Sequence, residues 1–297
     1  ETAETNTLKV LTAMREARVS EAHFTTTSGY AYDDIGRQKL DELYAAVFGA
    51  EKALVRTQFV SGTHALATVL FGILRPGDEL LSVTGAPYDT MQTVIGYAHP
   101  CSGSLKEFGV RYNEVALCAG KIDFSALRKA VTRQTKVALL QRSRGYSLRP
   151  PLTLTDISQA CQIIKAINPN CICFVDNCYG EFVDTREPTE AGADVIAGSL
   201  IKNPGGGITP TGGYIAGKAS LVELASYRLT APGIGSELGA SLANNRLLFE
   251  GVFLAPHVVS QALKGAIFAA GVFHKLGYTV SPGPLERRGD IIQAIEL

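Results

Sequence analysis

The sequence lacks net charge, long runs of charge of one sign and long apolar runs, and each absence excludes a class of protein. Its 297 residues include 28 basic and 28 acidic side chains, and no run of Lys or Arg exceeds a pair. This pattern argues against a nucleic-acid-binding surface. The longest charge-free stretch, Thr57–Leu74, contains Gln58, Ser61 and His64 and is too polar for a membrane span. We therefore expect a small molecule or another subunit as the partner, and neither nucleic acid nor a membrane.

The sequence also lacks paired cysteines of the kind that bind metals or form redox motifs. The six cysteines include no CxxC pair, and no histidine lies at a metal-ligand spacing from them. The first residues, ETAETNTLKV, lack the basic, apolar and cleavage regions of a signal peptide. We therefore expect a cytoplasmic protein without a metal site, whose cysteines are reduced and lie in the core: Cys101, Cys118, Cys161, Cys171, Cys173 and Cys178.

Short apolar runs rich in β-branched residues alternate with amphipathic stretches of helical length. Runs such as CICFVD and DVIAGS are apolar throughout, as is typical of strands buried on both faces of a parallel sheet. The sequence therefore predicts an α/β fold. The predicted strands are 53–59, 79–83, 111–117, 136–141, 171–176, 194–199 and 212–216. The predicted helices are 7–18, 37–48, 63–74, 124–131, 154–167, 220–227, 238–249 and 258–276.

Polar residues follow several of the predicted strands. In a parallel sheet, ligands bind outside the carboxyl ends of the strands. The sequence therefore predicts a candidate site along one edge of the sheet, formed by Ser61, Tyr88, Asp176, Ser199 and Lys202.

The segment SGTH, at residues 61–64, lies at a strand-to-helix turn. Backbone N–H groups, two hydroxyls and the helix dipole would converge there on an anion such as phosphate. The alternative is an ordinary helix N-cap.

Asp176 and Lys202 are the two charged residues of this edge. A carboxylate at the end of a buried strand requires a cation or strong donors, although Asp176 could instead cap the next turn. Lys202 precedes three glycines, and burial would lower its pKa and make the amine a usable nucleophile. The alternative for Lys202 is a surface lysine in a glycine-rich loop.

A phosphate cradle, an acid that partners a ring nitrogen and a lysine are what pyridoxal 5′-phosphate requires. The chain resembles the pyridoxal-phosphate enzymes of the aspartate-aminotransferase fold type. Within them it is similar to the Cys/Met metabolism branch, and to its aluminium-resistance or methionine γ-lyase-like subgroup. The resemblance covers nearly the whole chain and rests on GYAYDDIGRQKL, RTQFVSGTHAL, LRPGD, PYDT, QRSRGYS, VDNCYGEF, SLIKNPGGG and RRGDIIQAI.

The resemblance implies a role for each residue of the cofactor site. Lys202 would carry the cofactor and move the Cα proton of the substrate, and Asp176 would pair with the pyridinium nitrogen. The phosphate would be held by Ser61, Gly62, Thr63 and Ser199.

The resemblance also implies roles for three tyrosines. Tyr88 would stack on the cofactor ring and assist the leaving group. Tyr30 and Tyr32 would reach the phosphate site of a neighbouring subunit, so that the active unit would be a homodimer or a dimer of dimers. The alternative for each tyrosine is an ordinary core aromatic.

The chain departs from the branch in three places. Where the better-known lyases carry an Asn near the phenolic oxygen of the cofactor, this chain has QRSRGYS. Arg142 or Arg144 would replace that Asn or bind substrate. His64 would lie near the cofactor or cap its helix. We expect the C-terminal small domain, which in the branch carries the substrate-carboxylate arginine, to be mostly missing from this sequence.

These inferences predict a large pyridoxal-phosphate-binding domain at residues 37–257. An N-terminal helix and cross-subunit arm would precede it at 1–36, and a linker helix with the start of an incomplete small domain would follow at 258–297. The expected activity is that of a carbon–sulfur lyase acting on a sulfur amino acid. The alternatives are other pyridoxal-phosphate chemistry, such as transamination, racemisation or replacement, and a cofactor-binding stress-resistance protein with little turnover.

Overall fold

In a computed structural model of the chain, which describes residues 1–296, the core is a seven-stranded sheet. Its strand order is β1-β7-β6-β5-β4-β2-β3, and β7 runs antiparallel to both of its neighbours. The other six strands share one direction. All seven predicted strands are therefore confirmed: β1 (Lys52–Arg56), β2 (Glu79–Ser82), β3 (Arg111–Glu114), β4 (Thr135–Gln141), β5 (Ile172–Asp176), β6 (Val195–Ser199) and β7 (Gly213–Gly217).

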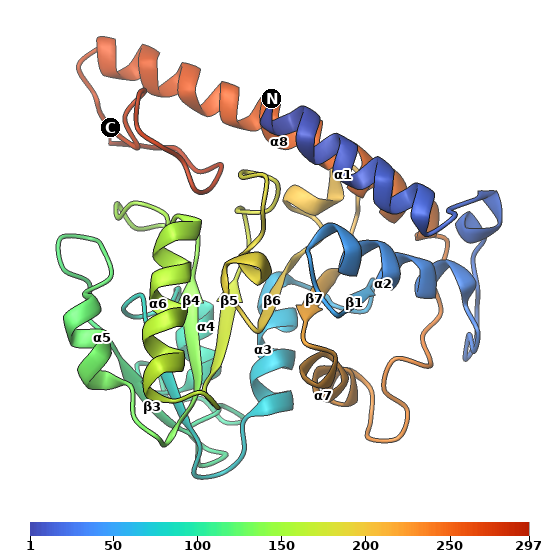
Figure 1. Cartoon of the computed structure of the whole chain (residues 1–297), viewed down its shortest axis with the longest axis horizontal. Helices are drawn as coiled ribbons and strands as arrows, with labels where there is room; N and C mark the ends of the chain where they lie inside the picture. The colour runs from blue at the N-terminus through green and yellow to red at the C-terminus, as the bar shows by residue number, and fades with distance from the viewer. Residues whose placement is uncertain (297) are drawn as a thin grey trace.

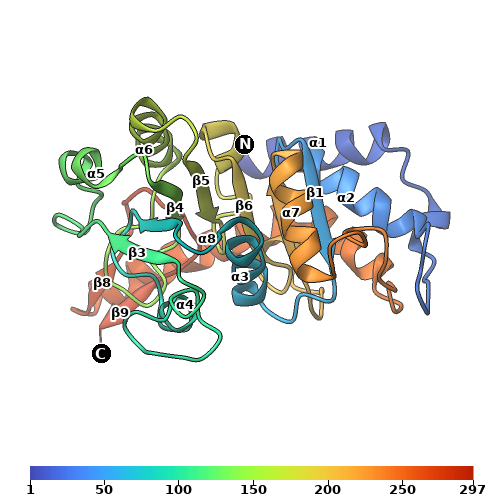
Figure 2. The ribbon, with the colours of Figure 1, turned by 90° about the horizontal axis from the view of Figure 1, so that it is seen from below.

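Helices cover both faces of the sheet (Figures 1 and 2). One face packs against α1 (Thr2–Glu16), α2 (Ile35–Val47), α5 (Phe124–Ala130), α6 (Leu154–Ile167) and the first half of α8 (Asn245–Lys275). The other packs against α3 (Gly62–Ile73), α4 (Asp89–Ile95) and α7 (Ala219–Leu229). Three short 3₁₀ turns, η1 (Glu21–Phe24), η2 (Pro188–Ala191) and η3 (Asn203–Gly205), and a hairpin of β8 (Thr279–Ser281) and β9 (Ala294–Glu296) complete the fold. The α/β class is confirmed.

Side-chain caps determine where several helices begin. Asp34 accepts a hydrogen bond from the Arg37 backbone N–H at the start of α2. Thr153 and Asp156 form a reciprocal capping box at the start of α6. These caps satisfy backbone N–H groups that have no partner within the helix.

The structure corrects the helices predicted at 238–249 and 258–276. A single helix, α8, spans Asn245–Lys275 and continues through Pro256. It also crosses residue 257, where a domain boundary was predicted. A short helix that was not predicted, α4, follows β2 and has only seven residues.

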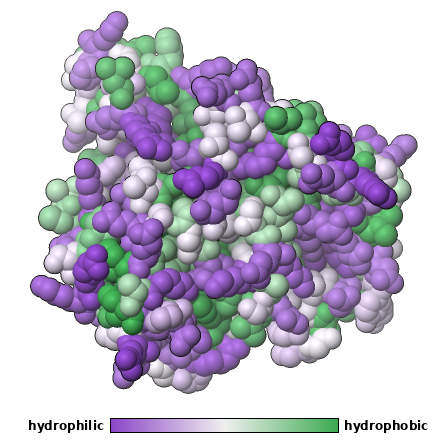
Figure 3. All heavy atoms as spheres, viewed as in Figure 1, coloured by the Kyte–Doolittle hydropathy of each residue, from purple (hydrophilic) through white to green (hydrophobic). Residues whose placement is uncertain are grey.

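By length and composition alone, α8 could cross a membrane. The prediction that the chain has no membrane span rests on Thr57–Leu74 and does not consider this helix. Its first half lies in the core, where Leu248 and Val252 are buried. Its second half exposes Ile267 and Phe268. Figure 3 shows apolar patches at the upper left, where this half lies. The structure thus gives the first half of α8 the role of a core helix.

The six cysteines are all free thiols, but they do not all lie in the core. Cys161, Cys171, Cys173 and Cys178 are buried, as predicted. Cys101 and Cys118 are exposed, so the prediction is wrong for these two. Both lie in or beside turns that connect elements at the surface, and short connections of this kind expose most of their side chains.

Asp194, just before β6, is a buried carboxylate that connects α6 and the start of α7 to the sheet. Its oxygens lie 2.7 Å from the amines of Lys165 and Lys218, and one accepts the Cys173 N–H at 2.8 Å. Burial opposes ionisation of Asp194, but these hydrogen bonds outweigh it and lower the pKa. The stability that this group contributes is therefore present above its ordinary pKa and is lost as the pH falls through the lowered pKa.

We expect Asp194→Asn to lower the free energy of unfolding by about 2 kcal/mol at pH 7, because it breaks both ion pairs. Lys218→Met, which removes the more exposed partner, should cost less than about 1 kcal/mol. Denaturant unfolding measures both, and the cost of Asp194→Asn should shrink below about pH 4. Equal costs at pH 7 and pH 3 would contradict the assigned role.

Candidate active site

The N-terminus of α3 forms one wall of the candidate site. Ser61 is the N-cap, and its hydroxyl accepts the backbone N–H of His64 at 3.1 Å. The Thr63 hydroxyl lies 3.0 Å from the Tyr88 hydroxyl. The N-cap predicted as the alternative is therefore present. It leaves the positive end of the helix dipole and the neighbouring backbone N–H groups directed to the same edge of the sheet.

Gly62, Ser199 and Cys178 pack closely beside Lys202. A Cβ atom on Gly62 would lie 3.2 Å from the Ser199 Cβ, 3.3 Å from the Cys178 Sγ and 3.8 Å from the Lys202 Nζ. Glycine therefore fits this close packing without displacing Ser199 or Cys178. The buried Ser199 hydroxyl has no hydrogen-bond partner within residues 1–296, and such a donor is costly unless a ligand or water satisfies it.

Lys202 lies at the carboxyl end of β6, just after the Ser199 turn. Its Nζ lies 4.0 Å from the centroid of the Tyr179 ring. Burial acts to lower the Lys202 pKa, but the negative forms of Cys178, Tyr179, Asp176 and Glu181 act the other way, and the pKa is raised. The prediction that burial lowers the Lys202 pKa is therefore wrong for the protein without a cofactor. In that state the Lys202 side chain is an ammonium ion at neutral pH.

Asp176 is 6% exposed and ends β5. One of its oxygens accepts the Cys178 backbone N–H at 3.1 Å, so the predicted turn cap is present as well. Burial raises the pKa of Asp176, while the Lys202 ammonium opposes that rise. The turn-cap role thus coexists with the electrostatic influence of Lys202 on this carboxyl.

A buried acid that the sequence did not single out, Glu181, lies close to this pair. Its Oε1 accepts a hydrogen bond from the Tyr214 hydroxyl at 2.8 Å, and its Oε2 has no partner among the residues described. Its backbone carbonyl accepts the side chain of Asn203, the residue after Lys202. Burial raises the Glu181 pKa to about 8. The sequence around Glu181 does not indicate that this acid is buried beside the site, because its partner Tyr214 lies 33 residues away in the chain.

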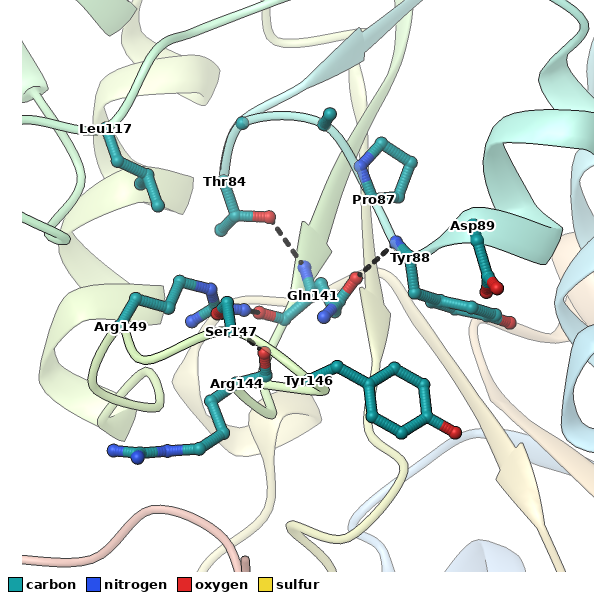
Figure 4. Close-up of a pocket in the computed structure, with 12 residues that line it drawn as sticks. Thr84, Pro87, Tyr88, Asp89, Leu117, Gln141, Arg144, Tyr146, Ser147 and Arg149 are labelled. Carbon is teal, nitrogen blue, oxygen red and sulfur yellow. Dashed lines mark hydrogen bonds between the residues drawn. The ribbon is translucent and has the colours of Figure 1, made fainter. Parts of the chain in front are cut away.

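Tyr88 forms the boundary between this group and a cavity of about 460 Å³. The Tyr88 backbone N–H donates to the Gln141 side chain at 3.1 Å, as Figure 4 shows. Burial, followed by the charge of Asp176, raises the Tyr88 pKa, so its hydroxyl keeps its proton at neutral pH. The cavity lies beyond the carboxyl ends of β2 and β4 and is lined mainly by Thr84–Asp89, Leu117, Gln141, Arg144, Tyr146, Ser147 and Arg149.

The two arginines predicted for substrate or cofactor have other partners. Arg142 is fully buried, and its guanidinium bonds Asn177 at 2.8 Å and Asp184 at 3.0 Å. It is therefore a structural residue behind the sheet edge. Arg144 lines the cavity, but its Nη1 donates to the Ser281 carbonyl and hydroxyl. Figure 4 shows its guanidinium directed away from Tyr88.

The remaining predicted residues lie outside this group. His64 packs against Phe59, its Nδ1 receives the Val60 N–H at 3.3 Å, and burial lowers its pKa. These contacts give it a local role in its own turn. Tyr30 and Tyr32 are 78% and 65% exposed and contact each other, so the core-aromatic alternative is wrong for both.

The residues at the sheet edge fit pyridoxal phosphate. The Ser199 hydroxyl, which has no partner among residues 1–296, and the start of α3 suit a phosphate. Asp176 and the Lys202 amine are available for a ring nitrogen and an aldehyde carbon.

We expect Glu181→Gln to remove one pH-dependent contribution to stability. The folded pKa of about 8 exceeds the ordinary value of 4.5, so between these values the folded state keeps a proton that the unfolded state has lost. Stability should therefore fall as the pH rises from 5 to 8, by up to a few kcal/mol from this group. The difference in unfolding free energy, Glu181→Gln minus wild type, should increase over that range. The exposed control, Glu250→Gln, should give a constant difference, and parallel curves for Glu181→Gln would contradict the assigned environment.

Comparison with known proteins places the chain in a family. A family model described as methionine gamma-lyase matches residues 1–297. The uncharacterized protein YnbB of Bacillus subtilis is 53% identical over 298 residues, which cover 100% of this chain and 71% of that protein. The solved structure of a carbon-sulfur lyase involved in aluminium resistance, from Clostridium novyi, is 51% identical with a TM-score of 0.97, covering 100% of this chain and 71% of the other. The L-methionine gamma-lyase of Pseudomonas putida is 27% identical over 76% of this chain and 52% of that enzyme. The chain therefore belongs to the methionine gamma-lyase family, whose enzymes depend on pyridoxal phosphate.

Proposed function

We propose that this protein binds pyridoxal phosphate at the sheet edge and is a carbon–sulfur lyase acting on a sulfur amino acid. The observation that carries the proposal is the convergence of Lys202, Asp176 and the unpartnered Ser199 hydroxyl beside the start of α3. Membership of the methionine gamma-lyase family supports it.

When bound, the cofactor supplies an electron-accepting ring that stabilises negative charge at the substrate Cα. Asp176 holds a proton at the ring nitrogen, and Ser61, Gly62, Thr63 and Ser199 hold the phosphate. The Lys202 amine removes the Cα proton once it is in its neutral form. The Tyr88 hydroxyl, which is protonated at neutral pH, donates a proton to the departing sulfur.

Two alternatives use the same anchors. Transamination, racemisation or replacement would need Lys202 and Asp176 in the same places, and a stress-resistance protein with little turnover would keep the binding site alone. A Tyr88 hydroxyl that keeps its proton suits the reactions that release a thiol, elimination and replacement, and has no such role in transamination or racemisation. Release of ammonia and a keto acid from methionine or cystathionine separates the lyase from these alternatives.

We expect the purified protein to be yellow after incubation with pyridoxal phosphate, and borohydride reduction to attach the cofactor mass to Lys202. Lys202→Ala should bind the cofactor weakly and lose turnover by at least about 10³-fold, because one amine both anchors the cofactor and moves the proton. Peptide mass spectrometry locates the adduct. The control Lys218→Ala removes a half-exposed lysine paired with Asp194 and should keep both properties. An adduct on any lysine other than Lys202 would overturn the assignment.

A second copy of the chain completes the site in this proposal. The loop that carries Tyr30 and Tyr32 is held by Arg37, whose Nη1 donates to the Ala31 and Gly239 carbonyls. The backbone is thus fixed while both rings remain exposed. Exposed aromatic rings on a fixed loop are typical of residues that bind a partner.

We expect Tyr32→Ala and Lys202→Ala chains to complement each other. Each variant alone should be impaired, whereas an equilibrated mixture should recover roughly a quarter of wild-type activity, since half of the random dimers carry one intact site of two. Native mass spectrometry establishes that mixed dimers form. Mixed dimers that remain inactive would place Tyr32 in the site of its own chain or outside the site.

A further inference from the structure

Glu181 and Tyr214 form a buried pair close to Lys202 that the proposed mechanism does not use. Both side chains are 0% exposed, and the Tyr214 hydroxyl donates to the Glu181 Oε1 at 2.8 Å. The pair packs against Gly198 in β6, where a Cβ atom would lie 2.6 Å from the Glu181 Oε1. Asn203, the residue after Lys202, donates to the Glu181 backbone carbonyl at 2.9 Å. Glu181 is thus fixed beside the turn that carries Lys202.

The hydrogen bonds around Tyr214 determine which oxygen of Glu181 can carry a proton. The Asn177 amide donates to the Tyr214 hydroxyl oxygen at 3.3 Å, which leaves the hydroxyl hydrogen for the Glu181 Oε1. Asn177 is itself oriented, because its side-chain oxygen accepts from Arg142 at 2.8 Å. Oε1 is therefore an acceptor, and a proton on this carboxyl belongs on Oε2, which has no hydrogen-bond partner among residues 1–296.

Glu181 lacks the compensation that its neighbour Glu187 receives. The Glu187 Oε2 lies 3.5 Å from Arg142 Nη1, whereas Glu181 forms no ion pair within residues 1–296. Burial therefore raises the pKa of Glu181 to about 8, and the charge of Glu187 acts in the same sense. The Glu181 carboxyl is uncharged at neutral pH and becomes negative above about pH 8.

Glu181 and Lys202 influence each other's charge. The Lys202 ammonium opposes the rise in the Glu181 pKa, and a Glu181 carboxylate raises the pKa of Lys202. In the described part of the chain no carboxylate lies within ion-pair distance of the Lys202 Nζ. The two groups therefore act on each other across the buried pocket and titrate as a coupled pair.

The other titratable groups that face this pair do not follow its titration. Burial raises the pKa of three phenols and one thiol, so these groups keep their protons between pH 7 and pH 9: Tyr44 of α2, Tyr88, Tyr214 and Cys178. Asp176 and Tyr179 face Lys202 from β5 and the turn after it, and both are present in every variant compared below. Glu181 is thus the group of this pocket whose charge changes near pH 8.

We propose that Glu181 is a positioning residue for the Lys202 amine: a negative Glu181 carboxylate holds Lys202 as an ammonium ion, whereas a protonated carboxyl lets the amine become neutral and bond to the cofactor. The Lys202 ammonium first loses one proton to water. Its nitrogen lone pair then bonds to the aldehyde carbon, and the aldehyde oxygen leaves as water with the two remaining amine hydrogens. This inference rests on the proposed function and adds a residue that controls the amine.

The coupling predicts how cofactor attachment depends on pH. Below about pH 8, a rise in pH increases the population of neutral Lys202 beside a protonated Glu181. Above it, Glu181 has already lost the first proton of the pair. The ammonium with a carboxylate and the neutral amine with a protonated carboxyl then contain the same number of protons, so their ratio no longer depends on pH. Attachment to wild type should therefore level off near pH 8.

The test measures the rate at which pyridoxal phosphate attaches to the cofactor-free full chain, by absorbance, between pH 7 and pH 9. The rate for Glu181→Gln divided by the wild-type rate cancels the titration of the cofactor itself. This ratio should be close to one at pH 7 and reach about tenfold at pH 9, because glutamine acquires no charge that holds the ammonium. The matched control Glu250→Gln, an exposed acid on α8, should give a ratio of one throughout.

Tyr214→Phe is a second variant that keeps the acid. It removes a hydrogen bond that lowers the Glu181 pKa, so the rate should level off at a higher pH than in wild type. At pH 9 attachment should then be up to several-fold faster than in wild type.

Two results would overturn the inference: a Glu181→Gln ratio that stays constant from pH 7 to pH 9, and a Tyr214→Phe rate that levels off at the wild-type pH or below it. If Glu181→Gln does not fold, the Tyr214→Phe profile decides. If wild type takes up no pyridoxal phosphate, the proposed function fails. Reductive methylation of Lys202 by formaldehyde and cyanoborohydride, measured by peptide mass spectrometry, then gives the same ratios for the same amine and decides the inference separately.

Discussion

The site depends on the common direction of the strands that surround it. Because β1, β2, β4, β5 and β6 run the same way, their carboxyl ends meet at one edge of the sheet. Asp176 and Ser199 are the last residues of their strands, and Lys202 follows three residues later. Because β7 runs the other way, its first residues lie at this edge, and Tyr214, its second residue, pairs with Gly198. Strand direction thus brings together residues that lie far apart in the chain.

This constraint explains how much could be predicted from the sequence. Most of the strands are short, largely apolar runs, and several are followed by polar residues, so both the strands and Ser61, Tyr88, Asp176, Ser199 and Lys202 could be identified. α4 was missed because seven residues carry too little periodicity. α8 was divided in two around Pro256, because proline inside a helix usually ends or kinks it, whereas this helix continues through it. The two exposed cysteines were misplaced because apolar neighbours in the sequence need not be neighbours in space.

The errors in the site concern charge, which depends on distant partners. The Lys202 pKa is raised because acids from β5 and the following turn surround it, and only the folded chain brings them there. Arg142 forms an ion pair with Asp184, whereas Arg149 donates to backbone carbonyls beside the cavity. Nothing in the sequence distinguishes the arginines of this segment. A sequence pattern identifies an ionisable residue, whereas its partners decide whether the residue is structural or free to bind.

The segment around the β8–β9 hairpin is hydrogen-bonded to the wall of the cavity. α8, about 46 Å long by its residue count, extends out of the core and leads into β8. Ser281 and Asp290 then connect back to the cavity segment through Arg144 and Ser143. Residues after α8 therefore supply the hydrogen bonds that hold Ser143 and Arg144 at the wall of the cavity. The shape of this wall thus depends on residues that lie 137 to 147 positions further along the chain.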